Sequence, residues 1–205
     1  MTASPVNWAN SITLLRFLAT PVFIGVLVKH REAFETGAPP DTLSLYRYIA
    51  LGVFSVAAAS DALDGFIARH FNQKTELGTI MDPLADKLLL IAAVLTLSLP
   101  FGLGAYRLPF WFPLLVLTRD LIIVVGIIII FMMRAHVHIR PSYTGKATTF
   151  FQMAVIVSVL LHVPVMLLDG LVLVTTILTA VSGIQYISRG FMLLHDTARA
   201  HGEDS

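Results

Sequence analysis

Four aspartates lie close together in a strongly apolar chain, at Asp61, Asp64, Asp82 and Asp86. The first two are three residues apart and the last two are four apart, so each pair lies on one face of its segment if that segment is helical. Acidic side chains are rare and costly inside a membrane, and four of them together would repel one another. Two hard divalent cations, Mg²⁺ or Mn²⁺, would compensate this charge, because both prefer oxygen ligands.

A pair of cations held by carboxylates suits phosphoryl chemistry. Such a pair can clamp a diphosphate, neutralise the transferring phosphoryl group and activate an attacking hydroxyl. Gly65 and Ala68 follow the first acidic pair and leave room for a nucleotide to approach the backbone. Arg69 offers a planar set of donors for a phosphate or a pyrimidine carbonyl. These residues predict a metal-dependent site for a nucleotide-linked diphosphate.

The composition places this site in a membrane protein. The 205 residues are 56% hydrophobic and 13% charged, whereas a soluble domain has about a quarter charged residues. Cysteine is absent, which excludes disulfides and thiolate metal ligands. The net charge of +1, with no basic tract, gives no reason to expect a nucleic-acid partner.

Hydropathy predicts an all-α bundle of six transmembrane helices in one domain over residues 1–205. The expected spans are 11–28, 46–68, 83–100, 108–133, 148–166 and 168–194. Trp8 suggests a short interfacial segment within Met1–Asn10. The longest connection, Lys29–Leu45, contains Gly37, Pro39 and Pro40 and is expected to be an irregular loop.

The basic residues are unequally divided between the two sides of this bundle. The side that carries both termini collects more of them than the other, so both termini and the acidic site are expected to face the cytoplasm, in a multi-pass protein of the cell membrane. The residues on that side are Arg69, Lys74, Lys87, Arg134, Arg140, Lys146, Arg189 and Arg199.

The segment from Asp61 to Asp86 resembles the signature of the CDP-alcohol phosphotransferase family, with two aspartates, Gly65, Ala68-Arg69, Gly78 and two more aspartates at matching spacing. The resemblance covers nearly the whole chain. It implies six transmembrane helices, a homodimer, membrane lipids as surroundings, and a polar cavity that opens to the cytoplasm. It also implies a CDP-lipid donor such as CDP-diacylglycerol and a glycerol-type acceptor.

The resemblance also assigns roles to individual residues. Asp61, Asp64 and Asp82 would hold the two metals, and Asp86 would contact one metal and act as the base for the acceptor hydroxyl. The residues that would contact the CDP-lipid are Gly65, Ala68, Arg69 and Thr75, together with Asn10 and Thr13 from the similar stretch Asn10–Arg16.

Other interpretations of these residues stay open. An acidic pair inside a membrane could serve an ion or proton pathway of a transporter. Asp82, which precedes Pro83, could cap the start of a helix as well as bind metal. His136 and His138 favour a solvated loop over a metal site, because no further ligands lie nearby.

The acceptor site is less sharply indicated. Arg119 and Asp120 lie in an apolar run, where they either pair with each other or Arg119 faces the polar cavity. Lys146 and Arg140 could receive an acceptor phosphate or could be ordinary cytoplasmic charge. Both stretches resemble the phosphatidylglycerophosphate synthase and the mitochondrial-type cardiolipin synthase branches. The resemblance does not separate the two branches, and Thr148 and Asp120 depart from the pattern of phosphatidylglycerophosphate synthases, which often carry a second Lys and a Glu at these places. Glycerol-3-phosphate is the first-ranked acceptor because its use is the commonest activity in this branch, phosphatidylglycerol is the second, and inositol phosphate is a further candidate.

Overall fold

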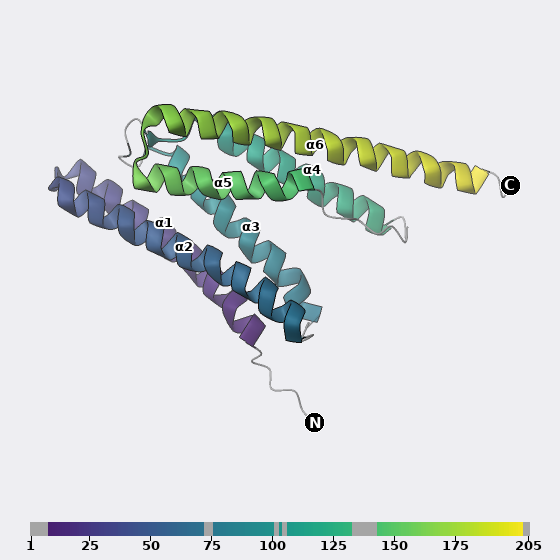
Figure 1. Cartoon of the computed structure of the whole chain (residues 1–205), viewed down its shortest axis with the longest axis horizontal. Helices are drawn as coiled ribbons and strands as arrows, with labels where there is room; N and C mark the ends of the chain where they lie inside the picture. Colours follow the sequence, from purple (N-terminus) through teal and green to yellow (C-terminus); the bar gives the residue numbers. More distant parts are fainter. Residues whose placement is uncertain (1–7, 72–75, 101–102, 104–105, 133–142, 203–205) are drawn as a thin grey trace, which may run out of the picture. The chain divides into compact units, whose positions relative to one another are not determined.

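A computed structural model describes the backbone of residues 8–71, 76–100, 103, 106–132 and 143–202, and the side chains of 15–60, 87–100, 103, 106–125 and 143–188. Within these ranges the regular structure is helical (Figure 1). The helices are α1 (Trp8–Glu35), α2 (Pro40–Phe71), α3 (Glu76–Ser98), α4 (Trp111–Met132), α5 (Tyr143–Leu161) and α6 (Val165–Gly202). The predicted all-α class is confirmed.

Each predicted span overlaps one helix, but the ends differ, and the span predicted at 148–166 is wrong at its end, because α5 ends at Leu161 and α6 begins at Val165. Helix α2 begins at Pro40, where hydropathy predicted 46, and α6 continues to Gly202, where it predicted 194. Hydropathy marks the apolar stretch that fits the bilayer core, whereas a helix continues until its backbone hydrogen bonds stop. Polar turns at either end were therefore missed. The interfacial segment predicted within Met1–Asn10 stays a prediction, because 1–7 lie outside the described residues and Trp8 already begins α1.

The connection between α1 and α2 is much shorter than the predicted loop Lys29–Leu45, and that prediction is wrong. Only residues 36–39 separate the two helices. Gly37 has a φ of 69°, and its N–H donates to the carbonyl of Phe34. The N–H of the next residue, Ala38, donates to the carbonyl of Ala33. This is a glycine-based helix ending, and Pro40 then occupies the first position of α2, where its missing N–H leaves no bond unmade.

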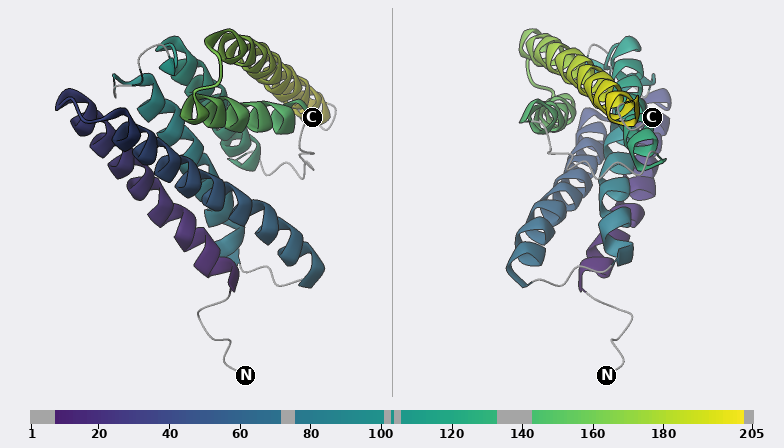
Figure 2. Two further views of the ribbon diagram at one scale, coloured as in Figure 1. Left: turned by 60° about the vertical axis from the view of Figure 1, so that its left-hand side comes forward. Right: turned by 90° about the vertical axis from the view of Figure 1, so that its right-hand side faces the viewer.

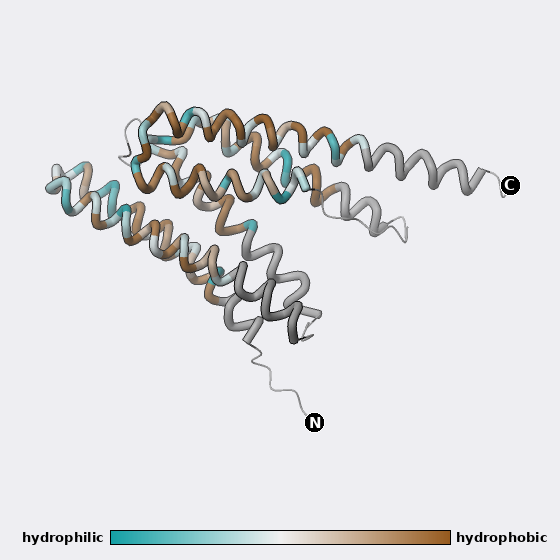
Figure 3. The backbone as a smooth tube through the Cα atoms, viewed as in Figure 1, coloured by the Kyte–Doolittle hydropathy of each residue, from teal (hydrophilic) through white to brown (hydrophobic). Residues whose placement is uncertain are grey.

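Exposed apolar side chains support a membrane environment. Among the described residues, three helical stretches are long and apolar enough to cross a bilayer, Pro40–Ser60, Tyr143–Leu161 and Val165–Ser188. Figure 3 shows apolar residues along the described length of α5 and α6. Large side chains such as Val56, Leu114 and Ile184 are 60% or more exposed, as expected for side chains that contact lipid. The chain is thus an all-α membrane protein.

The chain divides into two compact units. The first contains Met1–Leu108 and Ile156–Val165, and the second contains Pro109–Val155 and Met166–Ser205. In the first unit, α1 packs against both α2 and α3, and Figure 2 shows α1 and α2 running side by side. Phe23 and Phe54 are fully buried between α1 and α2, with ring centroids 6.1 Å apart. The prediction of a single domain stays a prediction.

His162, the residue that follows α5, has a backbone conformation that is unusual for a residue with a side chain. Its φ is 53°, its N–H donates to the carbonyl of Val159, and Val163 donates to that of Ser158. The same bonding pattern occurs at Gly37, where glycine adopts this φ without strain. The His162 ring stacks on Tyr106 with centroids 3.9 Å apart and an interplanar angle of 6°. The unusual backbone conformation thus occurs together with a tertiary contact of the same residue.

This histidine gives the first unit a testable dependence on pH. Burial, with further contributions from the charges of Arg47 and His30, lowers the pKa of His162 from 6.5 to about 4. Because the unfolded chain binds the proton near pH 6.5 and the folded chain does not, this contribution to stability is complete above pH 6.5 and is lost as the pH falls toward 4.

His162→Asn is expected to reduce the loss of thermal stability between pH 7.5 and pH 5. Asparagine tolerates the positive φ and does not titrate, although it loses the stacking on Tyr106, so its melting temperature at pH 7.5 is expected to be lower. The measurement is the melting temperature of detergent-solubilised protein at both pH values. If the melting temperatures of the wild type and the variant fall by the same amount between pH 7.5 and pH 5, His162 is not the titrating group.

The interior of the second unit contains both apolar and polar side chains. Phe112 and Val116 of α4 are buried, as is Val172 of α6. The buried polar residues of this unit are Arg119, Asp120, Thr148, Gln152, Thr175, Thr179 and Ser182. Buried polar groups in a membrane need hydrogen-bond partners within the protein, and these partners define the site described next.

Candidate active site

The four aspartates of the motif lie on two helices. Asp61 and Asp64 belong to the C-terminal part of α2, and Asp82 and Asp86 belong to the N-terminal half of α3. The backbone is helical at all four positions, so the three- and four-residue spacings place each pair on one side of its helix. Helix α2 also contacts α3 within the first unit. The side chains of these residues lie outside the described set.

This donor set fits hard divalent cations. It consists of four carboxylates on adjoining helices, in a chain without cysteine. Carboxylate oxygens are the ligands that Mg²⁺ and Mn²⁺ take in phosphoryl-transfer sites. Among the residues whose side chains are described, no group of three or more His, Asp or Glu could hold a metal. The aspartate motif therefore remains the candidate metal centre.

The structure corrects the capping role that Asp82 was predicted to share with metal binding. Helix α3 begins at Glu76, so Asp82 and Pro83 lie in its interior rather than at its start. Pro83 has no N–H and leaves one backbone carbonyl of the preceding turn without its helical partner. A residue in the helix interior cannot cap the first turn, which leaves metal binding as the predicted role of Asp82.

The residues predicted to contact the CDP-lipid are distributed over α1 and α2. Asn10 and Thr13 lie in the first two turns of α1, and Gly65, Ala68 and Arg69 lie in the last turns of α2. Their side chains, and Thr75 as a whole, lie outside the described residues. Since α1 packs against α2, these residues belong to one helix pair, and their contacts to substrate stay predictions.

Arg16, the last residue of the Asn10–Arg16 stretch, is a buried charge of the first unit. It lies one turn after Thr13 on α1 and is 1% exposed. A buried arginine inside a membrane helix is costly unless polar groups surround it. Arg16 is therefore a buried charge within a core that also contains Phe23 and Leu27. The signal in the sequence was a single arginine followed by a mostly apolar run as far as Val28.

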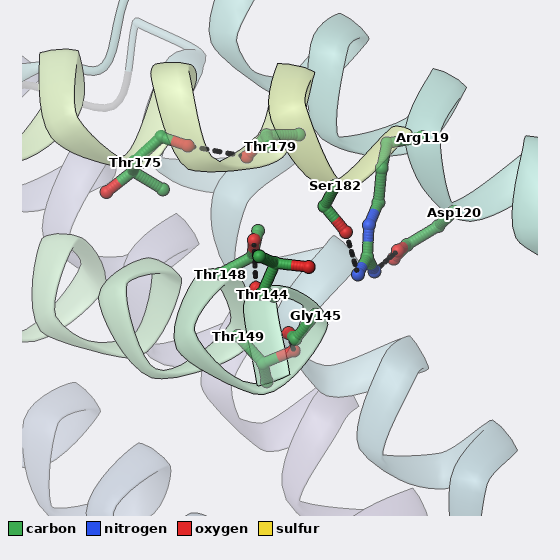
Figure 4. Close-up of polar contacts among 9 residues, drawn as sticks. All are labelled: Arg119, Asp120, Thr144, Gly145, Thr148, Thr149, Thr175, Thr179 and Ser182. Atoms are coloured by element: carbon green, nitrogen blue, oxygen red, sulfur yellow. Dashed lines mark hydrogen bonds and ion pairs between the residues drawn. The ribbon is translucent and has the colours of Figure 1, made fainter. Parts of the chain in front are cut away.

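Arg119 of α4 is the centre of the polar contacts in the second unit (Figure 4). Its Nη1 donates to Oδ1 of Asp120 at 2.7 Å, and its Nη2 donates to Oγ of Ser182 on α6 at 3.0 Å. Arg119 is 6% exposed and Asp120 is 8% exposed. Of the two possibilities that the sequence left open, the structure shows the pairing of Arg119 with Asp120.

The first turn of α5 lies against this arginine. A Cβ atom added to Gly145 would lie 3.0 Å from Nη2 of Arg119, so a side chain at this position would press on the guanidinium. Thr144 Oγ1 donates to Oε1 of Gln185 on α6 at 2.7 Å, which joins α5 and α6 at the same level. The guanidinium carbon of Arg119 lies 5.9 Å from the ring centroid of Tyr186, also on α6. Three helices thus meet at Arg119.

Lys146 follows Gly145 and differs from Arg119 in its surroundings. It is exposed and lies within the first turns of α5, which begins at Tyr143 rather than at the predicted 148. The structure therefore brings Arg119 and the backbone beside Lys146 together. The third predicted acceptor cation, Arg140, lies outside the described residues, as do His136 and His138.

Comparison with known proteins agrees with the motif. A family model for CDP-alcohol phosphatidyltransferases matches residues 6–183. The chain belongs to the CDP-alcohol phosphatidyltransferase family. Divalent-cation dependence is general in this family. The chain is thus an enzyme of phospholipid biosynthesis, and the ion-pathway alternative is set aside.

Relatives of the chain include both predicted branches. A Mycobacterium tuberculosis protein named "Probable phosphatidylglycerophosphate synthase" is 34% identical over 189 residues, which cover 89% of this chain and 81% of the relative. The Bacillus subtilis CDP-diacylglycerol–glycerol-3-phosphate 3-phosphatidyltransferase is 28% identical over 194 residues, or 92% and 97% of the two chains. The Streptomyces coelicolor cardiolipin synthase (CMP-forming) is 31% identical over 145 residues, or 69% and 59%.

Proposed function

We propose that this enzyme transfers the phosphatidyl group of CDP-diacylglycerol to glycerol-3-phosphate and releases CMP. The observation that carries the proposal is the aspartate motif on the helical segments of α2 and α3, in a chain that belongs to this family. The acceptor is supported by relatives named for glycerol-3-phosphate that match over nearly the whole of this chain, whereas the cardiolipin synthase relative matches over 69% of it.

The reaction is a substitution at the phosphorus that carries the diacylglycerol. The acceptor hydroxyl loses its proton to the Asp86 carboxylate, and its oxygen forms a bond to that phosphorus. The bond from the same phosphorus to the bridging diphosphate oxygen breaks, and CMP leaves with that oxygen. Asp61, Asp64, Asp82 and Asp86 would hold two divalent cations, Mg²⁺ or Mn²⁺, which supply neutralisation of the diphosphate charge.

The CDP-lipid is proposed to bind along the α1 and α2 pair. Asn10 and Thr13 would line the nucleotide side, while Gly65 and Ala68 leave space for it. Arg69 would donate to a phosphate or to the pyrimidine. Acyl chains would stay in the bilayer beside the exposed apolar faces of the helices. The cytoplasm-facing orientation and the homodimer implied by the resemblance are part of this proposal.

The acceptor phosphate is proposed to be matched mainly by Lys146, with Arg140 and Arg119 as further cations. Arg119 already has its charge balanced by Asp120 at 2.7 Å, so it contributes donors rather than net charge. Lys146 is exposed within the first turns of α5, and no carboxylate within 4.0 Å of it is recorded among the described residues. A phosphate dianion near the start of a helix also interacts favourably with the backbone N–H groups there.

Lys146→Ala is expected to raise the KM for glycerol-3-phosphate about tenfold to thirtyfold and to leave the KM for CDP-diacylglycerol within about twofold, because a charged headgroup loses its matching cation. The measurement is CMP release with each substrate varied in turn. Lys29→Ala is the matched control, since Lys29 is an exposed lysine that pairs with Glu32 at 2.7 Å and has no proposed role.

The same assay decides between the two acceptors. Phosphatidylglycerol carries a single phosphodiester charge and binds largely through its acyl chains, so Lys146→Ala is expected to affect its use less. If the wild-type enzyme releases CMP with phosphatidylglycerol and none with glycerol-3-phosphate, the cardiolipin synthase activity replaces the proposed one. An equal rise of both KM values in Lys146→Ala would contradict the acceptor role of this lysine.

A further inference from the structure

The hydroxyl of Ser182 differs from the other buried hydroxyls of α6 in where it bonds. Thr175 and Thr179 lie on the same helix and are fully buried, and each donates to a carbonyl of its own preceding turn, at 2.6 Å. Ser182 instead accepts a hydrogen bond from Arg119, 63 residues away on α4 (Figure 4). Its hydroxyl therefore joins two helices, whereas the threonine hydroxyls satisfy their own backbone.

The Arg119 guanidinium is restrained from several directions. Asp120 holds Nη1, Ser182 holds Nη2, and the ring of Tyr186 lies near its face. Two different guanidinium nitrogens donate hydrogen bonds, one to a carboxylate and one to a hydroxyl, and together these bonds fix the orientation of the planar group, which a single bond would not do. We refer to Arg119, Asp120, Gly145, Ser182 and Tyr186 as the guanidinium hub.

Gly145 connects this hub to α5. The backbone of α5 approaches Nη2 so closely that an added Cβ would lie 3.0 Å away, which is tighter than ordinary van der Waals contact. Lys146 is the next residue along the helix. The distance between the guanidinium and the first turn of α5 is thus set jointly by the Ser182 bond and by the missing side chain of Gly145.

We propose that Ser182 and Gly145 are positioning residues for acceptor use, which act by holding the Arg119 guanidinium against the first turn of α5 and so fixing the place of Lys146. The inference rests on the proposed acceptor site, since it assigns no contact between either residue and substrate. It predicts that changes at the hub alter acceptor affinity and leave CDP-diacylglycerol use largely unchanged.

Ser182→Ala is expected to raise the KM for glycerol-3-phosphate about threefold to tenfold, because a charged donor loses a buried partner and the guanidinium becomes free to reorient. The KM for CDP-diacylglycerol is expected to stay within about twofold. The matched control is Thr179→Val, which removes a buried hydroxyl from the same helix without touching Arg119. If Thr179→Val raises the acceptor KM as much as Ser182→Ala does, the effect is general destabilisation and the proposal is wrong.

Gly145→Ala tests the other side of the hub. The added methyl is expected to displace the guanidinium and to raise the KM for the acceptor. The control is Gly183→Ala, whose Cβ would lie 3.9 Å from Cγ of Arg119, an ordinary van der Waals contact, and which is expected to have little effect. Because both substitutions act through Arg119, the Ser182→Ala/Gly145→Ala double variant is expected to raise the KM by less than the product of the single effects. Independent, multiplicative effects would contradict a shared route through Arg119.

A second readout separates this proposal from the proposed function. Glycerol-3-phosphate is titrated against the melting temperature of the detergent-solubilised enzyme without CDP-diacylglycerol, which reports binding without turnover. A weaker shift in Ser182→Ala than in Thr179→Val supports the hub even if the wild type releases no CMP, in which case the proposed activity fails alone. Equal shifts and equal KM values in these two variants overturn the hub while the proposed function stands. Absence of any shift with glycerol-3-phosphate in the wild type overturns the positioning role for this acceptor.

Discussion

Asp86→Asn is expected to lower the turnover number for CMP release by about three orders of magnitude. Asparagine has the same size as aspartate. It cannot take the proton from the hydroxyl of glycerol-3-phosphate, and it contributes no negative charge to the proposed metal pair. A positioned general base contributes about 10² to 10⁴ in rate, and the loss of a metal ligand adds to that effect. The measurement is CMP release at saturating concentrations of both substrates.

The control for this variant is Asp169→Asn, which changes an exposed aspartate at the start of α6 and is expected to leave turnover unchanged. The elution profile of both variants should match that of the wild type, because Asp86 lies in a helical segment and asparagine has the same volume as aspartate. Turnover of Asp86→Asn within about threefold of the wild type would remove Asp86 from the base role.

The fold could be predicted from the sequence to the extent that the bilayer determines it. Each predicted apolar run marks the place of one helix among the described residues, whereas the number of helices that cross the bilayer stays a prediction. The ends could not be predicted in this way. At the α1–α2 connection, Gly37 and Pro40 indicated the break, but the polar residues on both sides of it are helical rather than irregular. Hydropathy does not register helical turns that extend into the headgroup region.

The aspartate motif could be predicted because its chemistry depends on spacing along the chain. Aspartates three or four residues apart lie on one face of a helix, and this can be recognised without knowing the tertiary structure. Acidic residues are also conspicuous in an apolar sequence. The family membership agrees with that prediction. The individual metal and substrate contacts stay predictions, because these side chains lie outside the described set.

Of the guanidinium hub, the sequence offered only the Arg119–Asp120 pair, as one of two possibilities, because two opposite charges in an apolar run compensate each other. The contacts of Arg119 with Ser182 and Gly145 could not be predicted. Ser182 contacts Arg119 across 63 residues of sequence, and one serine in an apolar helix has many possible partners. Gly145 likewise resembles any small residue until the neighbouring guanidinium is known.

His162 shows the same limit in the first unit. A histidine in a short connection between apolar helices gives no sign that its φ will be 53° or that its ring will stack on Tyr106. Both features depend on where the residues around 106 lie. Local sequence rules favour glycine at such a helix ending, as at Gly37, and the exception arises from a tertiary contact.

Removal of divalent cations is expected to abolish CMP release, and Mg²⁺ or Mn²⁺ added above the chelator concentration is expected to restore it. Ca²⁺ is expected to restore little, since its longer bonds and variable coordination hold a diphosphate less rigidly. Four carboxylates on adjoining helices repel one another without cations, so chelation is also expected to lower the melting temperature.

The variant Asp61→Asn separates metal binding from indirect effects of the chelator. It is expected to need a higher Mg²⁺ concentration for half-maximal activity and to show a smaller thermal stabilisation by Mg²⁺ than the wild type, because one of the four carboxylates is gone. Asp169→Asn, with its exposed carboxylate far from the motif in sequence, is expected to titrate like the wild type. Full CMP release in excess chelator would refute the cation pair. An unchanged Mg²⁺ requirement in Asp61→Asn would instead remove Asp61 from the ligand set, since a ligand that is lost must weaken the affinity of the site it helped to form.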